Sequence, residues 1–215
     1  MKIKKIGWTS FLISTDDISV LTDPLLLKES GASFPKTQVD VCLFTNCVVK
    51  GQEGALRATG LDQKVFPDKR KKVIEICTAG EYEVGGIMIR RGLNDDFYII
   101  DEKNLRVVYM GGTGKDIDPE EVKNLGDVDA LILPVGDGEL FIDYEKLEKI
   151  ISNIDPAILI PCGFKGESKN HTELKTKEEF IKYFGYANAT EEGYINLAKK
   201  RVEEDQKSVE VIFLK

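Results

Sequence analysis

The chain has 215 residues, of which 42% are hydrophobic and 31% are charged. This composition is typical of a soluble globular protein that needs neither disulfides nor metal ions to fold. The formal net charge of −7 argues against general affinity for nucleic acid or for an anionic membrane. No apolar run approaches the roughly 18 residues of a membrane-spanning helix, and the first residues do not have the pattern of a secretory leader. We therefore predict a cytoplasmic protein with reduced cysteines.

The first half of the chain is predicted to consist mainly of short strands. Apolar runs of strand length cover residues 2–7, 10–14, 18–22, 39–45, 73–77, 81–84, 87–91, 97–100 and 105–110. The run at 39–45 is almost continuously apolar, so this strand should be buried on both faces. Pro24 should end the first group of strands because it has no amide hydrogen to donate to a ladder.

The second half alternates strands with helices. Asp118 as N-cap and Pro119 at the first position predict a helix over 119–125. Apolar residues at helical spacing predict a longer helix over 143–153. The remaining expected elements are strands at 130–134 and 157–160, a helix at 177–184, and strands at 194–202 and 208–214. This order predicts two sheets with helices packed outside them, in a single domain over residues 1–215.

Several segments carry a resemblance to a known family. They are residues 6–13 with 21–24, 39–45, 79–87, 109–114, 128–136 and 156–161. In the same order, they resemble segments of metallo-β-lactamase-fold hydrolases, in particular the branch of ascorbate-6-phosphate-lactonase-like enzymes. The matches cover nearly the whole chain. The resemblance implies an α/β (α+β) fold built as a four-layer αββα sandwich, with the functional site at one edge of the paired sheets.

The same resemblance implies that the metal site has been lost. In active relatives, histidines and carboxylates hold one or two zinc ions, and the metal lowers the pKa of a bound water. The positions that correspond to these ligands carry Asn46, Val48, Lys50, Gly51, Asn94, Gly112 and Gly163. None is a zinc ligand, and the ammonium of Lys50 would repel a dication. We therefore expect no metal, no cofactor and no inherited catalytic residue.

Four further residues are expected to line the former cleft: Trp8, Asp23, Cys47 and Cys162. Trp8 stands where relatives have a histidine next to the metal ligands, and Asp23 is interpreted as a structural hydrogen-bonding residue. Cys47 and Cys162, with Asp95 or Asp96, could instead form a replacement metal site. Buried structural cysteines are much commoner than ligands, so this reading is the weaker one.

Two other catalytic arrangements lack a component. The glycine-rich segment 111–115 does not have the spacing of a phosphate-binding loop. Ser10 and Ser14 have no histidine to act as base, because the lone His171 lies in a polar stretch, 165–175, that predicts an exposed loop. A metal-free carboxylate pair drawn from Asp23, Asp95 and Asp137 stays open.

We therefore predict a non-catalytic protein that keeps the fold for binding, sensing or assembly. Its partner would be a small anionic ligand, with Lys50 supplying positive charge, or another protein. Neither nucleic acid nor a membrane is expected, and homo-oligomerisation stays open. The alternative is a phosphoester or lactone hydrolase with a rebuilt active site, metal-dependent or metal-free.

Overall fold

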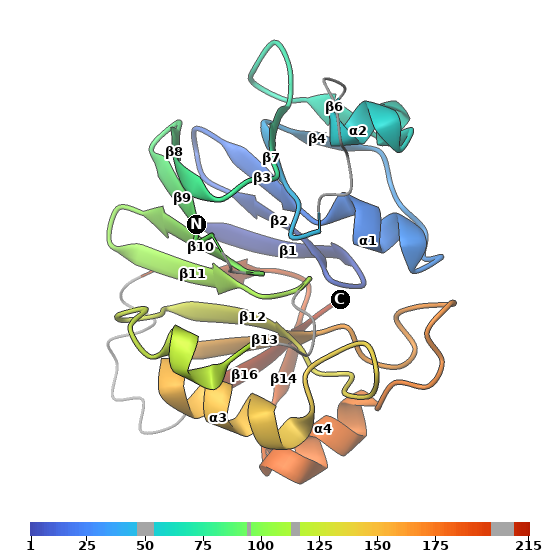
Figure 1. The fold of residues 1–215 in the computed structure, drawn as a ribbon, viewed down its shortest axis with the longest axis vertical. Coiled ribbons are helices and arrows are strands. Elements are labelled where there is room, and N and C mark those ends of the chain that lie inside the picture. Colours follow the sequence, from blue (N-terminus) through green and yellow to red (C-terminus); the bar gives the residue numbers. More distant parts are fainter. Residues whose placement is uncertain (47–53, 94–95, 113–116, 199–208) are drawn as a thin grey trace.

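Two β-sheets packed face to face form the centre of the molecule, and helices cover their outer faces (Figure 1). The structure is a computed structural model, and it describes residues 1–46, 54–93, 96–112, 117–198 and 209–215. The first sheet has the strand order β15-β1-β2-β3-β5-β7. Its strands are β1 (Lys2–Gly7), β2 (Ser10–Ser14), β3 (Ser19–Thr22), β5 (Val41–Leu43), β7 (Ile74–Ile76) and β15 (Ile195–Asn196). β1 to β3 form an antiparallel meander, whereas β3, β5 and β7 are parallel.

The second sheet has the order β14-β16-β13-β12-β11-β10-β9-β8. Its strands are β8 (Gly80–Val84), β9 (Ile87–Arg91), β10 (Tyr98–Glu102), β11 (Leu105–Tyr109), β12 (Ala130–Pro134), β13 (Ile158–Cys162), β14 (Thr190–Glu192) and β16 (Glu210–Leu214). The strands from β8 to β11 are antiparallel, and those from β11 across to β14 are parallel. A separate parallel pair joins β4 (Thr37–Val39) to β6 (Val65–Pro67).

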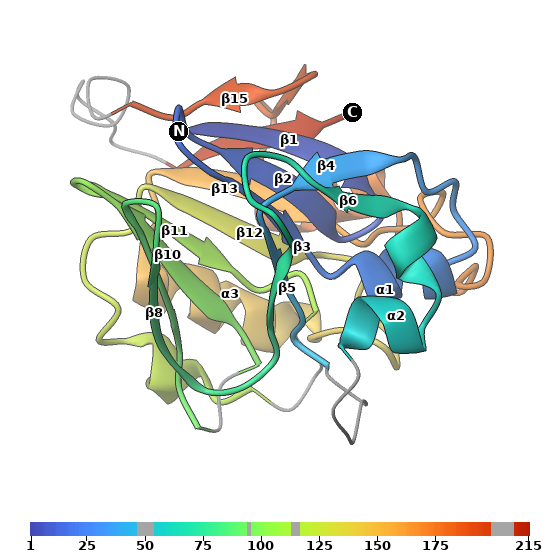
Figure 2. The ribbon, with the colours of Figure 1, turned by 90° about the horizontal axis from the view of Figure 1, so that it is seen from above.

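The helices form the two outer layers, α1 and α2 on the side of the first sheet and α3 and α4 on the side of the second (Figures 1 and 2). Their bounds are α1 (Pro24–Glu29), α2 (Ala55–Ala58), α3 (Tyr144–Ile154) and α4 (Lys177–Phe184), with 3₁₀ turns η1 (Leu61–Gln63) and η2 (Pro119–Val122). α3 begins at Asp143, whose side chain accepts a hydrogen bond from the Lys146 amide. α4 begins at Thr176 with a reciprocal capping box to Glu179. These local signals place both helix starts where the sequence predicts them.

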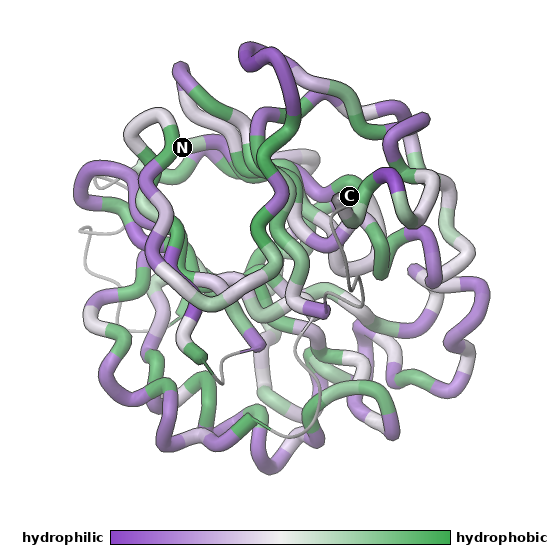
Figure 3. Tube along the Cα trace, turned by 45° about the horizontal axis from the view of Figure 1, so that its top comes forward, coloured by the Kyte–Doolittle hydropathy of each residue, from purple (hydrophilic) through white to green (hydrophobic). Residues whose placement is uncertain are grey.

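Apolar side chains from both sheets form the central core, and further apolar clusters join each sheet to its helices. Alternate residues of β11, for example, face opposite layers: Val107 and Tyr109 lie between the sheets, and Val108 packs toward α3. Figure 3 shows the hydrophobic parts of the trace along the sheets and the hydrophilic parts mainly in peripheral loops. The predicted αββα sandwich is therefore confirmed. No helix among the described ranges has the length and apolar character needed to cross a bilayer.

Some local predictions are wrong. The apolar run at 39–45 breaks into two strands at Asp40, which is fully buried and accepts hydrogen bonds from the backbone of Ser19, Lys69 and Arg70. The expected helix at 119–125 is the short η2, although Asp118 does cap it. Helices α1 and α2 and strands β6 and β14 were not anticipated. The expected strand at 194–202 is the two-residue β15 in the part that the structure describes.

Candidate functional site

The candidate site lies where the carboxyl ends of strands from both sheets meet. Asp23 follows β3, Thr45 follows β5 by two residues, Gly112 lies just beyond β11, and Gly163 follows β13. Ligand sites of parallel α/β sheets form at the carboxyl ends of strands. The sequence places its candidate residues at this edge, and the structure brings Asp23, Gly112 and Thr45 into direct proximity.

Asp23 is the centre of a buried hydrogen-bond network. Its Oδ1 accepts from the Thr45 amide at 2.7 Å, and its Oδ2 accepts from the Thr45 hydroxyl at 2.9 Å. The Tyr109 hydroxyl lies 2.7 Å from Oδ2 and 3.0 Å from the Thr9 carbonyl oxygen. Asp23 itself has left-handed backbone angles, φ 39° and ψ 56°, which aspartate tolerates better than most residues. The expectation of a structural, hydrogen-bonding Asp23 agrees with this geometry.

Burial sets the acidity of Asp23. Removal from water raises its pKa from 3.8 to about 6, although the hydrogen bonds from Thr45 and Tyr109 and the positive charge of Arg91 all lower it. Desolvation is the larger effect because the carboxylate is 2% exposed. Burial and the neighbouring Asp23 raise the pKa of Tyr109 as well, so the phenol remains a neutral donor near neutral pH.

Arg91, at the end of β9, holds the strand ends together. Its guanidinium donates to the carbonyl oxygens of Phe44 at 2.9 Å, Thr45 at 2.7 Å and Cys77 at 3.1 Å. The Tyr98 hydroxyl lies 3.3 Å from the same guanidinium and donates to the Phe44 carbonyl at 2.8 Å. Arg91 thus ties the second sheet to the carboxyl ends of β5 and β7, and places a fixed positive charge beside Asp23.

Gly112 has no room for a side chain. A Cβ at this position would lie 1.7 Å from the Thr45 hydroxyl oxygen and 2.6 Å from Oδ2 of Asp23. The family resemblance assigns this position to a metal-bridging aspartate, whose side chain would need the space that the Asp23–Thr45 pair occupies.

Gly163 is constrained in two ways. Its φ of +65° is a left-handed conformation that favours glycine, and a Cβ would lie 3.0 Å from carbons of the Phe141 ring. The histidine that the resemblance assigns here would therefore meet both backbone strain and a packed ring.

Trp8 is buried between aromatic neighbours. Its ring lies 5.6 Å from the ring of His171, nearly parallel at 16°, and 5.6 Å from Phe141. Residues 165–175 form a loop, as expected, and most of its residues are exposed, but the loop is anchored at buried points. Ser168 is buried, the amides of Lys169 and Asn170 donate to the carbonyl of Ser30, and the loop thereby packs on the end of α1.

The cysteines are not equivalent. Cys42 and Cys162 are free and fully buried, and burial raises the pKa of both thiols. Cys77 is disulfide-bonded, so the expectation of four reduced cysteines is wrong. A thiol must lose its proton to bind a metal, which makes Cys162 a poor ligand where it stands.

The other candidates divide between described and undescribed residues. Asn46 is exposed, Asp96 lies 3.7 Å from Arg91, and Asp137 is paired with Lys175 at 2.8 Å. Predicted site residues that lie outside the described residues are Cys47, Val48, Lys50, Gly51, Asn94 and Asp95. Predictions that depend on these six residues stay predictions.

The described side chains do not fit the metal centre that the resemblance associates with this fold. No group of three or more histidine, cysteine, aspartate or glutamate residues within 1–46, 54–93, 96–112, 117–198 and 209–215 could hold a metal ion. Asp23, the carboxylate nearest the centre, already accepts three hydrogen bonds. These side chains form a hydrogen-bond network around Asp23 rather than a set of unoccupied metal ligands.

Sequence reasoning missed Arg91, Tyr98, Thr45 and Tyr109 as residues of this site. The one available signal was the placement of Tyr109 and Thr45 at the ends of apolar strands, since polar groups there converge at one sheet edge. Arg91 gave no such signal because it ends an antiparallel hairpin strand.

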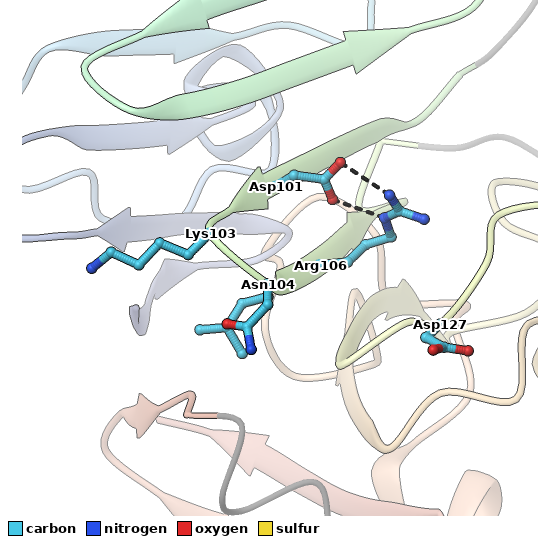
Figure 4. Close-up of a pocket in the computed structure, with 6 residues that line it drawn as sticks. Asp101, Lys103, Asn104, Arg106 and Asp127 are labelled. Atoms are coloured by element: carbon cyan, nitrogen blue, oxygen red, sulfur yellow. Dashed lines mark hydrogen bonds and ion pairs between the residues drawn. The ribbon is translucent and has the colours of Figure 1, made fainter.

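A separate pocket of about 280 Å³ lies at the other end of β11. Figure 4 shows Asp101 and Arg106 paired across the β10–β11 turn, with Lys103, Asn104 and Asp127 around them. Arg106 also donates to the Leu125 carbonyl. These contacts secure the turn.

The sequence matches the profile described as a β-lactamase superfamily domain over residues 2–163. A search of curated protein sequences gave no significant match. Among solved structures, the chain is similar to a candidate Zn-dependent hydrolase of the metallo-β-lactamase superfamily from Thermotoga maritima. The TM-score is 0.71 at 19% identity, over 100% of this chain and 98% of that one.

Two further structures are similar at lower scores. The metallo hydrolase Igni18 from Ignicoccus hospitalis has a TM-score of 0.59 at 15% identity, over 87% of this chain and 91% of that one. A candidate metal-dependent hydrolase from Parabacteroides distasonis has a TM-score of 0.57 at 19% identity, over 99% and 93%. At these identities the structural likeness shows a shared fold alone.

Proposed function

Because this chain belongs to the metallo-β-lactamase superfamily, we propose that it is a member that has lost its metal ligands and keeps the fold to bind a ligand or partner without turnover. The observation that carries the proposal is the crowding at Gly112. A Cβ there would meet the Thr45 hydroxyl oxygen at 1.7 Å, so a bridging aspartate cannot be accommodated beside the Asp23–Thr45 pair.

Three other features support the proposal. Asp23 already accepts three hydrogen bonds. Arg91 supplies a permanent positive charge next to it, which would repel an incoming dication. Trp8 packs against His171 and Phe141, so an apolar ring fills the position where relatives have a histidine next to the metal ligands. We further propose that the chain belongs to the ascorbate-6-phosphate-lactonase-like branch, forms a single domain over residues 1–215 and is cytoplasmic.

The metal content of the intact chain tests the proposal, because it also covers the residues that the structure does not describe. The purified protein would be dialysed against trace zinc and manganese and measured by inductively coupled plasma mass spectrometry. We expect less than about a tenth of an equivalent per chain, since a metal site needs several preformed, deprotonated ligands. One or two equivalents that survive dialysis and are removed by a chelator would overturn the proposal.

The alternative is a hydrolase with a rebuilt site, and one observation favours it. A carboxyl whose pKa is raised to about 6 is typical of general acids and bases. Its 2% exposure weighs against contact with a substrate. Turnover of a phosphoester and lactone panel that disappears in Asp23→Asn or Cys162→Ala, with folding intact, would establish the alternative. No turnover above the blank is the expected result.

A further inference from the structure

A small pocket lies beside the candidate site, between the end of β1, the residue stretch after α1, the 163–168 loop and the end of β16. Its volume is about 210 Å³, below the roughly 300–1,000 Å³ of pockets that hold drug-sized ligands. Ile6, Trp8, Ala32 and Leu214 contribute apolar walls, Lys5 and Glu167 contribute charge, and Lys215, which is paired with Glu191, also lines the pocket. The size and the walls suit a molecule of fewer than about ten heavy atoms with an apolar body.

The charged pair in this pocket is almost completely buried. Lys5 and Glu167 form an ion pair, with side chains 4% and 16% exposed. Burial raises the pKa of Glu167, and the neighbouring ammonium of Lys5 lowers it. A buried ion pair is costly unless its remaining donors and acceptors are satisfied.

The two partners differ in how far they are satisfied. Glu167 accepts from Lys5 through Oε1 and from the Gly163 amide, at 2.9 Å, through Oε2. An ammonium has three donors, yet within the described part of the chain Glu167 is the one hydrogen-bond acceptor of Lys5. Its other close neighbours are the rings of Phe164, at 5.0 Å, and Phe11, at 6.0 Å. Lys5 therefore has hydrogen-bond donors that the described residues leave unused.

We propose that this pocket binds a small molecule with an apolar body and an acceptor oxygen at one end, a carboxylate or a carbonyl, with the oxygen accepting from Lys5. The inference rests on the proposed binding role of the chain and names its ligand class. Amines do not fit, because they would compete with Lys5 for Glu167 and leave the ammonium donors unfilled. Because the charge of Lys5 is balanced by Glu167, the Lys5 ammonium can donate to either a ligand carboxylate or a neutral ligand carbonyl.

Trp8 provides a direct readout, since it lines the pocket and is the one tryptophan of the sequence. Intrinsic fluorescence would be titrated with hexanoate, hexanamide and hexylammonium. We expect saturable changes with a Kd of about 1 mM, the range of a small fragment, for hexanoate, hexanamide or both, and none for hexylammonium. Which of the first two binds distinguishes the carboxylate from the carbonyl head.

Two variants test the pocket by different routes. Lys5→Met removes the donor, and Ala32→Leu fills the apolar space while leaving the ion pair intact. Lys4→Met is the matched control, because Lys4 is exposed on the same strand. Binding should weaken at least about tenfold in both pocket variants and stay unchanged in the control.

The inference is overturned if neither acyl probe gives a saturable change, if hexylammonium binds equally well, or if Ala32→Leu binds like the wild type. These outcomes are independent of metal content. A metal-free protein that fails to bind would remove this inference alone, and a metal-loaded protein that binds would remove the proposed function alone.

Discussion

The buried carboxyl of Asp23 makes the stability of this protein depend on pH in a direction opposite to that of most aspartates. Its pKa is raised from 3.8 to about 6, so the folded state holds the proton more tightly than the unfolded state. The favourable contribution of protonated Asp23 to the free energy of unfolding is complete below about pH 3.8 and is lost as the pH rises through about 6. The difference corresponds to about 3 kcal/mol, at about 1.4 kcal/mol per pH unit.

Asp23→Asn should abolish this dependence. An amide resembles the protonated carboxyl: its oxygen can accept from the Thr45 amide, and its nitrogen can donate to the hydroxyls of Thr45 and Tyr109. Tyr109 can then donate its own proton to the Thr9 carbonyl, 3.0 Å away. Asparagine also tolerates the left-handed backbone found at this position.

The assay is urea unfolding of wild type and variant between pH 4 and pH 8. We expect similar free energies of unfolding near pH 4 and a variant more stable by up to about 3 kcal/mol above pH 7. The exposed Asp17→Asn controls for the loss of one negative charge. Differences in other titrating groups, including Glu167, cancel in the comparison. A difference between Asp23→Asn and wild type that does not change with pH would refute the reasoning.

Two further predictions concern the same sheet edge. Gly112→Ala should lower the free energy of unfolding by about 3 kcal/mol or more, because the added Cβ collides with the Thr45 and Asp23 side chains. Gly193→Ala, where a Cβ meets nothing within 4 Å, should be nearly neutral in the same denaturant titration, and equal losses would contradict the steric argument. Arg91→Lys should cost about 2–4 kcal/mol because an ammonium cannot replace the fork that reaches three carbonyls. Thermal unfolding would compare this variant with Arg57→Lys, a control at an exposed position. Equal melting temperatures for the two variants would contradict the prediction.

The architecture was largely readable from the sequence. Strand-length apolar runs predicted β1 to β3 and β8 to β13 because burial of alternate or consecutive residues leaves a local pattern. Apolar residues at helical spacing predicted α3 within one residue of its observed bounds. The caps at Asp143 and Thr176 act within one helical turn of the two helix starts, but the predictions of α3 and α4 did not use them. The sequence alone also shows that Gly112 and Gly163 cannot bind a metal through a side chain, since glycine has none.

Where a polar residue interrupts a strand, the sequence alone was a poorer guide. Residues 39–45 read as one strand, yet Asp40 divides them. Its carboxylate finds partners in Ser19 and in the distant amides of Lys69 and Arg70. Likewise His171 lies in a polar stretch but stacks on Trp8, from the opposite end of the chain.

The chemistry of the site was decided by tertiary structure. The identity of Asp23 was plain from the sequence, but its acidity depends on desolvation, on Tyr109 and on Arg91, which packing brings together from different strands. The same holds for the space at Gly112, which Thr45 and Asp23 close off. Local sequence patterns determine which segments form strands and helices. Burial and steric room depend on contacts between residues far apart in the chain, and such contacts exist only once the two sheets have packed.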